Sequence, residues 1–167
     1  MKNGSTLHEE FLKELEAEAA STRKCLERIP EKLFSWKPHE RSMLMGYLAQ
    51  VVADIPHWIT LIVDTPAIDF ATYKNVPLKT TSDLVTFFDK NLQEAKTALQ
   101  NMSDESLSEN FSLKHGDTVL STSSKRESIS SSLNHMVHHR GQLTVYMRLN
   151  DIPVPSIYGP SADEKTF

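Results

Sequence analysis

The sequence is poor in residues that several classes of protein need. Of its 167 residues only Cys25 is a cysteine, so no disulfide can form within the chain and a disulfide-stabilised fold is excluded. Its five glycines form no Gly-rich loop, which argues against a phosphate-binding loop. The net charge is −4 and lysine and arginine form no block, so the electrostatic footprint of a nucleic-acid-binding protein is missing.

Long apolar runs are also missing. No stretch approaches the length of about 18 apolar residues that a membrane span needs, and the first residues carry no apolar segment typical of a signal peptide. We therefore expect a cytoplasmic protein with no nucleic acid or membrane partner. The apolar content of 39% is ordinary for a globular protein, and the length predicts a single domain over residues 1–167.

What the sequence does contain is helical periodicity, with apolar residues every three or four positions. We expect helices over about residues 6–29, from a cap at Ser42 to Thr65-Pro66 with a kink near Pro56, from Thr81 or Ser82 to about 102, and from the serine-rich run to about 150. Residues 66–80 read as a long crossover, 111–120 as a weak hairpin, and the proline-rich end as extended. The predicted fold is all-α: a four-helix bundle with one long crossover loop and an extended C-terminal tail.

Three of the seven histidines fall within five residues of the last predicted helix. His135 and His139 are four positions apart, so on a helix their imidazoles share one face about one turn apart. Two imidazoles in this arrangement can share one divalent metal ion. His138 lies roughly 100° around the helix from His139 and does not join the pair easily. A polar helix face with solvated histidines has the same spacing, so spacing alone leaves both interpretations open.

The surroundings of this pair are more specific. Three segments, WKPHERSM (36–43), LAQVVADIPHW (48–58) and NHMVHHRGQLTVYMRLNDIPVPSIYGPSADE (134–164), resemble the DinB-like (DinB/YfiT) family of metalloenzymes, and the resemblance covers nearly the whole chain. It implies a four-helix bundle, often a homodimer, with a divalent metal such as zinc or nickel held by three histidines. One histidine comes from the second helix and two, here His135 and His139, come from the fourth.

The chain departs from the family pattern at the ligand from the second helix. The pattern reads Leu-Ala-x-His, whereas this chain reads LAQV over residues 48–51, so the third histidine is replaced by Val51. Valine cannot bind a metal ion. Because a catalytic site usually keeps three protein ligands, and losing even an outer partner costs about 10–100-fold in affinity, two imidazoles with water form a much weaker site.

Three neighbours of Val51 are candidates for the missing ligand. Asp54 lies three residues later on roughly the same face, although a solvent-facing or ion-paired acid is the commoner use of such a residue. Gln50 is offset by one residue, and His57 lies roughly 9 Å further along the helix axis. The sequence leaves open whether water, Asp54 or the substrate completes the metal shell, and His57 fits a packing role beside Pro56 better.

Two functions from different classes follow from the resemblance. In the first, a metal-dependent transferase or hydrolase uses a low-molecular-weight thiol as cofactor, with the metal on His135 and His139. In the second, Val51 marks a bundle that has lost metal chemistry and keeps its pocket as a binding or stress-associated module for a small-molecule ligand. The sequence leaves both open.

Other polar and aromatic residues have structural interpretations. Cys25 lies on an apolar helix face and is expected to be a buried thiol. Arg140 follows the histidine pair on the core side and is expected to form a structural ion pair rather than an anion site. Trp36 and Trp58 fit core or interface positions. The tail over residues 158–164 is expected to pack over the bundle or a neighbouring subunit.

Overall fold

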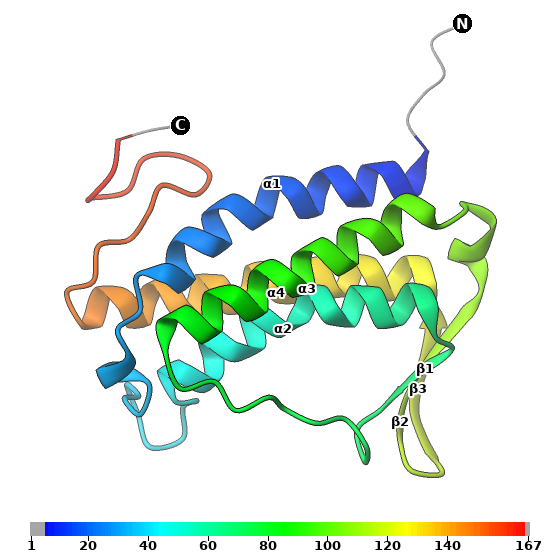
Figure 1. Cartoon of the computed structure of the whole chain (residues 1–167), viewed down its shortest axis with the longest axis horizontal. Coiled ribbons are helices and arrows are strands. Elements are labelled where there is room, and N and C mark those ends of the chain that lie inside the picture. Colours follow the sequence, from blue (N-terminus) through cyan, green and yellow to red (C-terminus); the bar gives the residue numbers. More distant parts are fainter. Residues whose placement is uncertain (1–5, 166–167) are drawn as a thin grey trace, which may run out of the picture.

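The computed structural model describes residues 6–165, which form a four-helix bundle with a small sheet at one end (Figure 1). The helices are α1 (Leu7–Glu27), α2 (Met45–Asp64), α3 (Thr81–Asn101) and α4 (Lys125–Leu149). Helices α1 and α2 each pack against both α3 and α4. The apolar faces predicted from the helical periodicity therefore meet in one core, which includes Leu15, Leu48, Phe88 and Leu133.

The direction of the helices explains the long connection between α2 and α3. These two helices run in the same direction, so the segment over residues 65–80 must return along the length of the bundle before α3 begins (Figure 1). The predicted single long crossover is therefore present. The short 3-10 helices η1 (Glu31–Leu33) and η2 (Glu105–Ser108) lie in the other two connections, each of which joins helices at one end of the bundle.

The expectation of an all-α fold is wrong in one respect, because the chain also forms a three-stranded mixed sheet. Strands β2 (Asn110–His115) and β3 (Thr118–Ser124) form an antiparallel hairpin, which confirms the weakly predicted one. Strand β1 (Ala67–Asp69) lies within the crossover and pairs parallel to β2, with Ile68 opposite Leu113. A three-residue strand whose partner lies more than 40 residues away leaves no local pattern, so the sequence did not reveal it.

The start of α2 also differs from the expectation. Ser42 is not its cap, because the helix begins at Met45 and the capping position is Leu44. Backbone carbonyls take the place of a capping side chain: the amide of Met45 donates to Trp36 O at 2.8 Å and that of Gly46 donates to Phe34 O at 3.0 Å. These bonds satisfy donors that a helix start leaves without intrahelical partners.

Helix α2 is the most apolar of the four and lies between α3 and α4. It continues through Pro56 as one helix. Contrary to the expectation from apolar run length, α2 is long and apolar enough to cross a membrane by length and composition, and it is the one such helix within residues 6–165. Half of that apolar stretch is buried inside the bundle, and core helices share this composition. Its apolar character is therefore explained by packing.

The C-terminal tail packs over α1 and the end of α4, which is the first of its two expected placements, over the bundle or over a neighbouring subunit. Arg28 on the α1 side forms an ion pair with Glu164, and Arg148 binds Asp163 at 2.5 Å. The Tyr158 hydroxyl lies 2.8 Å from Nη2 of Arg140. Two carboxylates with no assignable chemistry in the sequence therefore hold the tail in place.

Arg140 and Cys25 have the structural roles expected of them. Arg140 is 1% exposed and forms an ion pair with Glu18 at 2.6 Å, with further bonds to hydroxyls of α1. Cys25 is fully buried, and burial raises the pKa of its thiol to about 11. A thiol with that pKa is almost entirely protonated at neutral pH, which fits an inert core residue.

Candidate functional site

Two imidazoles of α4 lie side by side with their planes tilted by 43°, one helical turn apart as the four-residue spacing predicts. The Nε2 atoms of His135 and His139 are 2.7 Å apart, and the ring centroids are 4.5 Å apart. His138 contacts the ring of His139 but is exposed and does not line the same pocket. The two Nε2 atoms therefore converge on one point, whereas the third histidine of the cluster turns away from it.

Neighbouring groups define the protonation of this pair. Nδ1 of His139 lies 2.7 Å from Oε1 of Gln142, an acceptor, so Nδ1 carries the proton and Nε2 offers its lone pair. Burial, followed by the nearby charge of His139 and His138, lowers the pKa of His135. His135 is therefore neutral at neutral pH and donates its Nε2 proton to His139. Gln142 is the kind of outer partner that orients a metal-binding histidine.

The histidine pair faces a pocket of about 330 Å³ between α2 and α4, which we call the histidine pocket. Val51 and Asp54 of α2 form the facing wall, so the position at which the resemblance implies a histidine does face the pair. The crossover segment closes the pocket from above through Phe70 and Tyr73. Two polar imidazoles therefore share a partly open pocket with a carboxylate and an apolar side chain.

Asp54 is a buried carboxylate, 7% exposed, and two donors bind one of its oxygens. Its Oδ2 accepts from the Tyr73 hydroxyl at 2.6 Å and from Nε1 of Trp58 at 3.1 Å. Within residues 6–165, Oδ1 has no hydrogen-bond partner. Burial together with the bond to Asp54 raises the pKa of Tyr73, which keeps this phenol protonated and donating. The carboxylate thus anchors the crossover and retains a free oxygen.

The three candidates for the missing ligand have different fates. Asp54 reaches the histidine pocket, but within the described part of the chain no three His, Cys, Asp or Glu side chains are close enough to hold one ion. Gln50 donates to the carbonyl of Val76 at 2.6 Å and so ties the crossover to α2. His57 lines a different pocket. None of these three residues therefore completes a three-ligand site with the two imidazoles.

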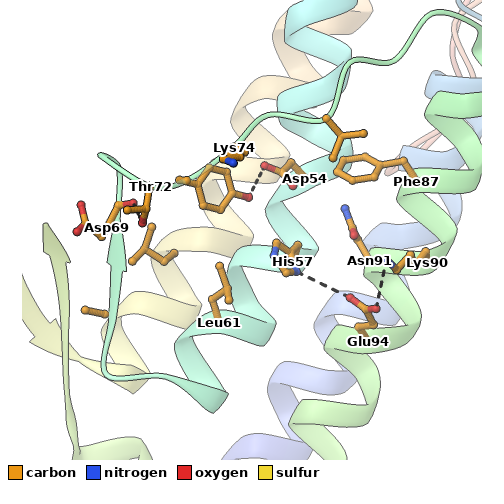
Figure 2. A pocket seen from close by; sticks show the side chains of 14 residues that line it. Asp54, His57, Leu61, Asp69, Thr72, Lys74, Phe87, Lys90, Asn91 and Glu94 are labelled. Carbon is orange, nitrogen blue, oxygen red and sulfur yellow. Dashed lines mark hydrogen bonds and ion pairs between the residues drawn. The ribbon is translucent and has the colours of Figure 1, made fainter. Parts of the chain in front are cut away.

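Figure 2 shows the pocket that contains His57, which has about 420 Å³ and lies between α2, α3 and the crossover. Nδ1 of His57 is buried and accepts or donates no hydrogen bond within residues 6–165, while Oε2 of Glu94 lies 3.8 Å away. Lys90 contacts the same carboxylate at 3.8 Å. Asp54 forms part of both pockets, so it separates this space from the histidine pocket.

The model of one family, described as the DinB family, matches residues 1–166. The chain belongs to the DinB family. This confirms the family that the three segments of sequence resemble, while the metal-ligand role of the histidine pair in this DinB protein rests on that resemblance alone. Metal binding by His135 and His139 stays a prediction.

Solved structures of DinB-like proteins share the fold of this DinB protein. The chain is similar to YjoA of Bacillus subtilis (TM-score 0.71, 18% identity, covering 95% of this chain and 99% of that one). It is also similar to DinB-like proteins from Bacillus cereus ATCC 10987 (0.69, 24%, 92% and 98%) and Exiguobacterium sibiricum 255-15 (0.69, 21%, 92% and 98%). At these identities the likeness shows the fold alone.

A local match in sequence points to one further relative. Over 32 residues the DinB protein is 53% identical to the uncharacterized protein YrdA of Bacillus subtilis, and the matched segment covers 19% of each chain. The short match assigns no activity, because that relative is itself uncharacterized.

Sequence reasoning missed two residues that shape the histidine pocket. Gln142 lies three positions after His139, on the same helix face, and that spacing is a signal that could have found it. Tyr73 was placed in the crossover, but its bond to Asp54 joins segments 19 residues apart through a loop whose path has no sequence pattern. Trp58 packs against the core as expected, and it also lies against the ring of His135 with centroids 5.4 Å apart.

Proposed function

We propose that this DinB protein is a metal-dependent transferase or hydrolase that uses a low-molecular-weight thiol as cofactor. The observation that carries the proposal is the convergence of the two Nε2 atoms of His135 and His139 in a partly open pocket, with Gln142 fixing the tautomer of one ring. A surface pair of solvated histidines has no need of that orientation, whereas metal ligands do.

The donor set fits a divalent ion such as zinc or nickel with open positions. His135 and His139 would hold the ion through Nε2, which requires the Nε2 proton of His135 to be lost and its neutral ring to be protonated at Nδ1 instead. Because Val51 supplies no donor, the remaining positions fall to solvent or to the thiol itself. When bound, a divalent ion lowers the pKa of a thiol or water beside it. Asp54 is the carboxylate of the pocket, and its free Oδ1 is the atom we assign to receive the released proton.

The chain's own residues also control access. The crossover covers the histidine pocket through Phe70 and Tyr73, and the bond from Tyr73 to Asp54 fixes that cover. Val51 keeps the wall opposite the imidazoles apolar. Partial exclusion of water strengthens charge interactions inside such a pocket.

Metal retention tests the proposal. Protein loaded with zinc or nickel and then dialysed should retain about one ion per chain by elemental analysis, and His135→Ala should abolish retention. The matched control is His138→Ala, since His138 is exposed and outside the pocket, and it should retain the ion. A wild-type protein that holds no ion under these conditions refutes the enzyme in its metal-dependent form.

Two further measurements sharpen this test. Val51→His should raise the affinity for the metal ion more than about tenfold. Outer partners already change metal affinity by about 10–100-fold, and a histidine that faces the pair binds the ion directly and should have a larger effect. With cobalt as a spectroscopic substitute, a simple thiol such as cysteamine should produce a thiolate-to-metal absorption band. Absence of the band in cobalt-loaded protein refutes the thiol part while leaving the metal site standing.

A second function is favoured by Val51 itself. A valine at the ligand position and imidazoles that bond to each other at 2.7 Å also suit a bundle that binds a small molecule without catalysis, as a stress-associated module. This function predicts ligand binding that is insensitive to a chelator. The metal-retention measurement separates the two functions.

We extend both proposals to a homodimer in the cytoplasm. Met43, Leu44 and Tyr47, next to the histidine pocket, are large apolar residues that are 39%, 42% and 48% exposed. A cluster of this kind suits burial against a second copy. Light scattering of the purified protein measures the number of subunits, and a monomer at all concentrations refutes the dimer.

A further inference from the structure

A third cavity adjoins the histidine pocket and carries no role so far. It has about 310 Å³ and lies between α2, α4 and the sheet. Its floor consists of Ile62, Ile68 and Phe111, each at most 5% exposed. One wall consists of serines from β3 and α4, including Ser121 and Ser132, and we call this cavity the serine pocket.

The two cavities share a partition. Trp58, Phe70 and His135 line both the histidine pocket and the serine pocket. A molecule held in the serine pocket therefore lies against the same His135 ring that belongs to the predicted metal site. The sheet forms the outer wall of the serine pocket, and β1, contributed by the crossover, supplies Ile68.

One polar group in the serine pocket lacks a partner. Ser132 is only 8% exposed, and within residues 6–165 its hydroxyl makes no hydrogen bond. Ser128 and Ser123, by contrast, bond to each other at 2.8 Å. Nδ1 of His57 is the one fully buried polar side-chain atom without a partner within residues 6–165, so the Ser132 hydroxyl is accessible from the pocket and can bond to a ligand that carries a hydrogen-bonding group.

We propose that the serine pocket binds an aromatic group that carries a hydrogen-bonding substituent, such as a phenol. Three aromatic side chains, Trp58, Phe70 and Phe111, line the space, and aromatic rings pack favourably against one another. The volume is about twice that of a 150 Å³ cavity that holds benzene, so it admits one or two fused rings. The hydroxyl of Ser132 bonds to the substituent.

The proposal deepens the proposed function, because it names the substrate class of the same site. An aromatic substrate held against Trp58 directs its remaining substituent along the His135 ring toward the histidine pocket. Binding of the aromatic group itself needs no metal. Measured in the presence of a chelator, it therefore succeeds or fails independently of metal retention, and the two proposals can be refuted separately.

Calorimetric titration of the chelated protein with 2-naphthol tests the proposal. We expect saturable binding with one site per chain. Ser132→Ala should weaken it about threefold to tenfold, the factor given by a single hydrogen bond of about 0.5–1.5 kcal/mol. The matched control is Ser130→Ala, because Ser130 lies on the same helix but outside the pocket, and it should leave the affinity unchanged.

A filling variant and a location readout complete the test. Ser121 is an exposed residue of the rim, so Ser121→Trp should fold and should weaken binding more than tenfold. In a Trp36→Phe background the only indole N–H signal is that of Trp58, and 2-naphthol should shift it. No saturable binding, or binding that Ser132→Ala or Ser121→Trp leaves unchanged, overturns the proposal.

Discussion

Loss of Glu18 should strongly destabilise the bundle, because it leaves a buried charge without its counter-charge. The Arg140 side chain is 2% exposed and that of Glu18 is 14% exposed, with Nη2 and Oε2 2.6 Å apart. Removing one member of such a pair costs about 3–5 kcal/mol. The slight exposure of Glu18 argues for the lower end, so we expect Glu18→Ala to reduce the free energy of unfolding by about 3 kcal/mol.

Remaining contacts of Arg140 soften this loss without cancelling it. Its Nη1 still donates to the carbonyl of residue 18 at 3.1 Å, to Ser21 at 2.9 Å and to Thr22 at 3.1 Å. These groups are neutral and cannot balance the charge. For a domain of this length, about 3 kcal/mol corresponds to a melting temperature lower by about 6–12 °C.

Helix α1 provides a matched control for this prediction. Glu16 forms an ion pair with Lys96 at the same distance, 2.6 Å, but the side chains are 45% and 28% exposed. Because of solvent screening, such a pair contributes only about 0–1 kcal/mol to stability, so Glu16→Ala should change the free energy of unfolding little. Urea unfolding of both variants measures the difference. If Glu18→Ala lies within about 1 kcal/mol of Glu16→Ala, burial does not decide the strength of these pairs, and the reasoning is refuted.

Two further predictions concern a helix start and the tail. Gly46→Ala should destabilise the protein by about 1–3 kcal/mol, because the added Cβ meets Phe34 Cβ at 2.7 Å. Gly141→Ala, which has open space around it in α4, should stabilise the protein by about 0.5–1 kcal/mol. Equal effects of the two variants on urea unfolding would contradict this prediction. The bond from Arg148, followed by that from the Val154 amide at 2.8 Å, lowers the pKa of Asp163. A lowered pKa in the folded state means that this contact stabilises above about pH 3.9, the unfolded value, and is lost as the pH falls through the lower folded value. The Val154 amide shift should follow that transition, and Asp163→Asn should abolish it.

The helices were predictable because each buries one face, and that requirement leaves a periodic pattern. The polar entry to α4 is an example: Ser124 caps the helix by accepting from the amide of Glu127 at 3.2 Å, so a serine-rich run that resembles low-complexity sequence is the start of a helix. The start of α2 was misplaced because backbone carbonyls rather than a side chain cap it, and a carbonyl leaves no mark in the sequence.

The candidate site divides in the same way. His135 and His139 on one face, with Val51 and Asp54 on the facing wall, follow from spacing along two helices. The hydrogen bond from Tyr73 to Asp54 does not follow from helical spacing. It depends on the path that the crossover takes after its first residues pair with β2. Helical spacing predicts which side chains share a face, and it is silent on contacts that irregular segments bring in.

The crossover gives this architecture a cover that is separate from its scaffold. The segment over residues 65–80 runs the length of two helices that point the same way, yet at its centre only the Tyr73 hydroxyl and the Val76 carbonyl reach α2 through hydrogen bonds. Changes in that stretch therefore alter what enters the space above the imidazoles while the four helices keep their packing. In a chain with this architecture, substitution of about a dozen surface residues can change which ligand binds, without substitutions in the core.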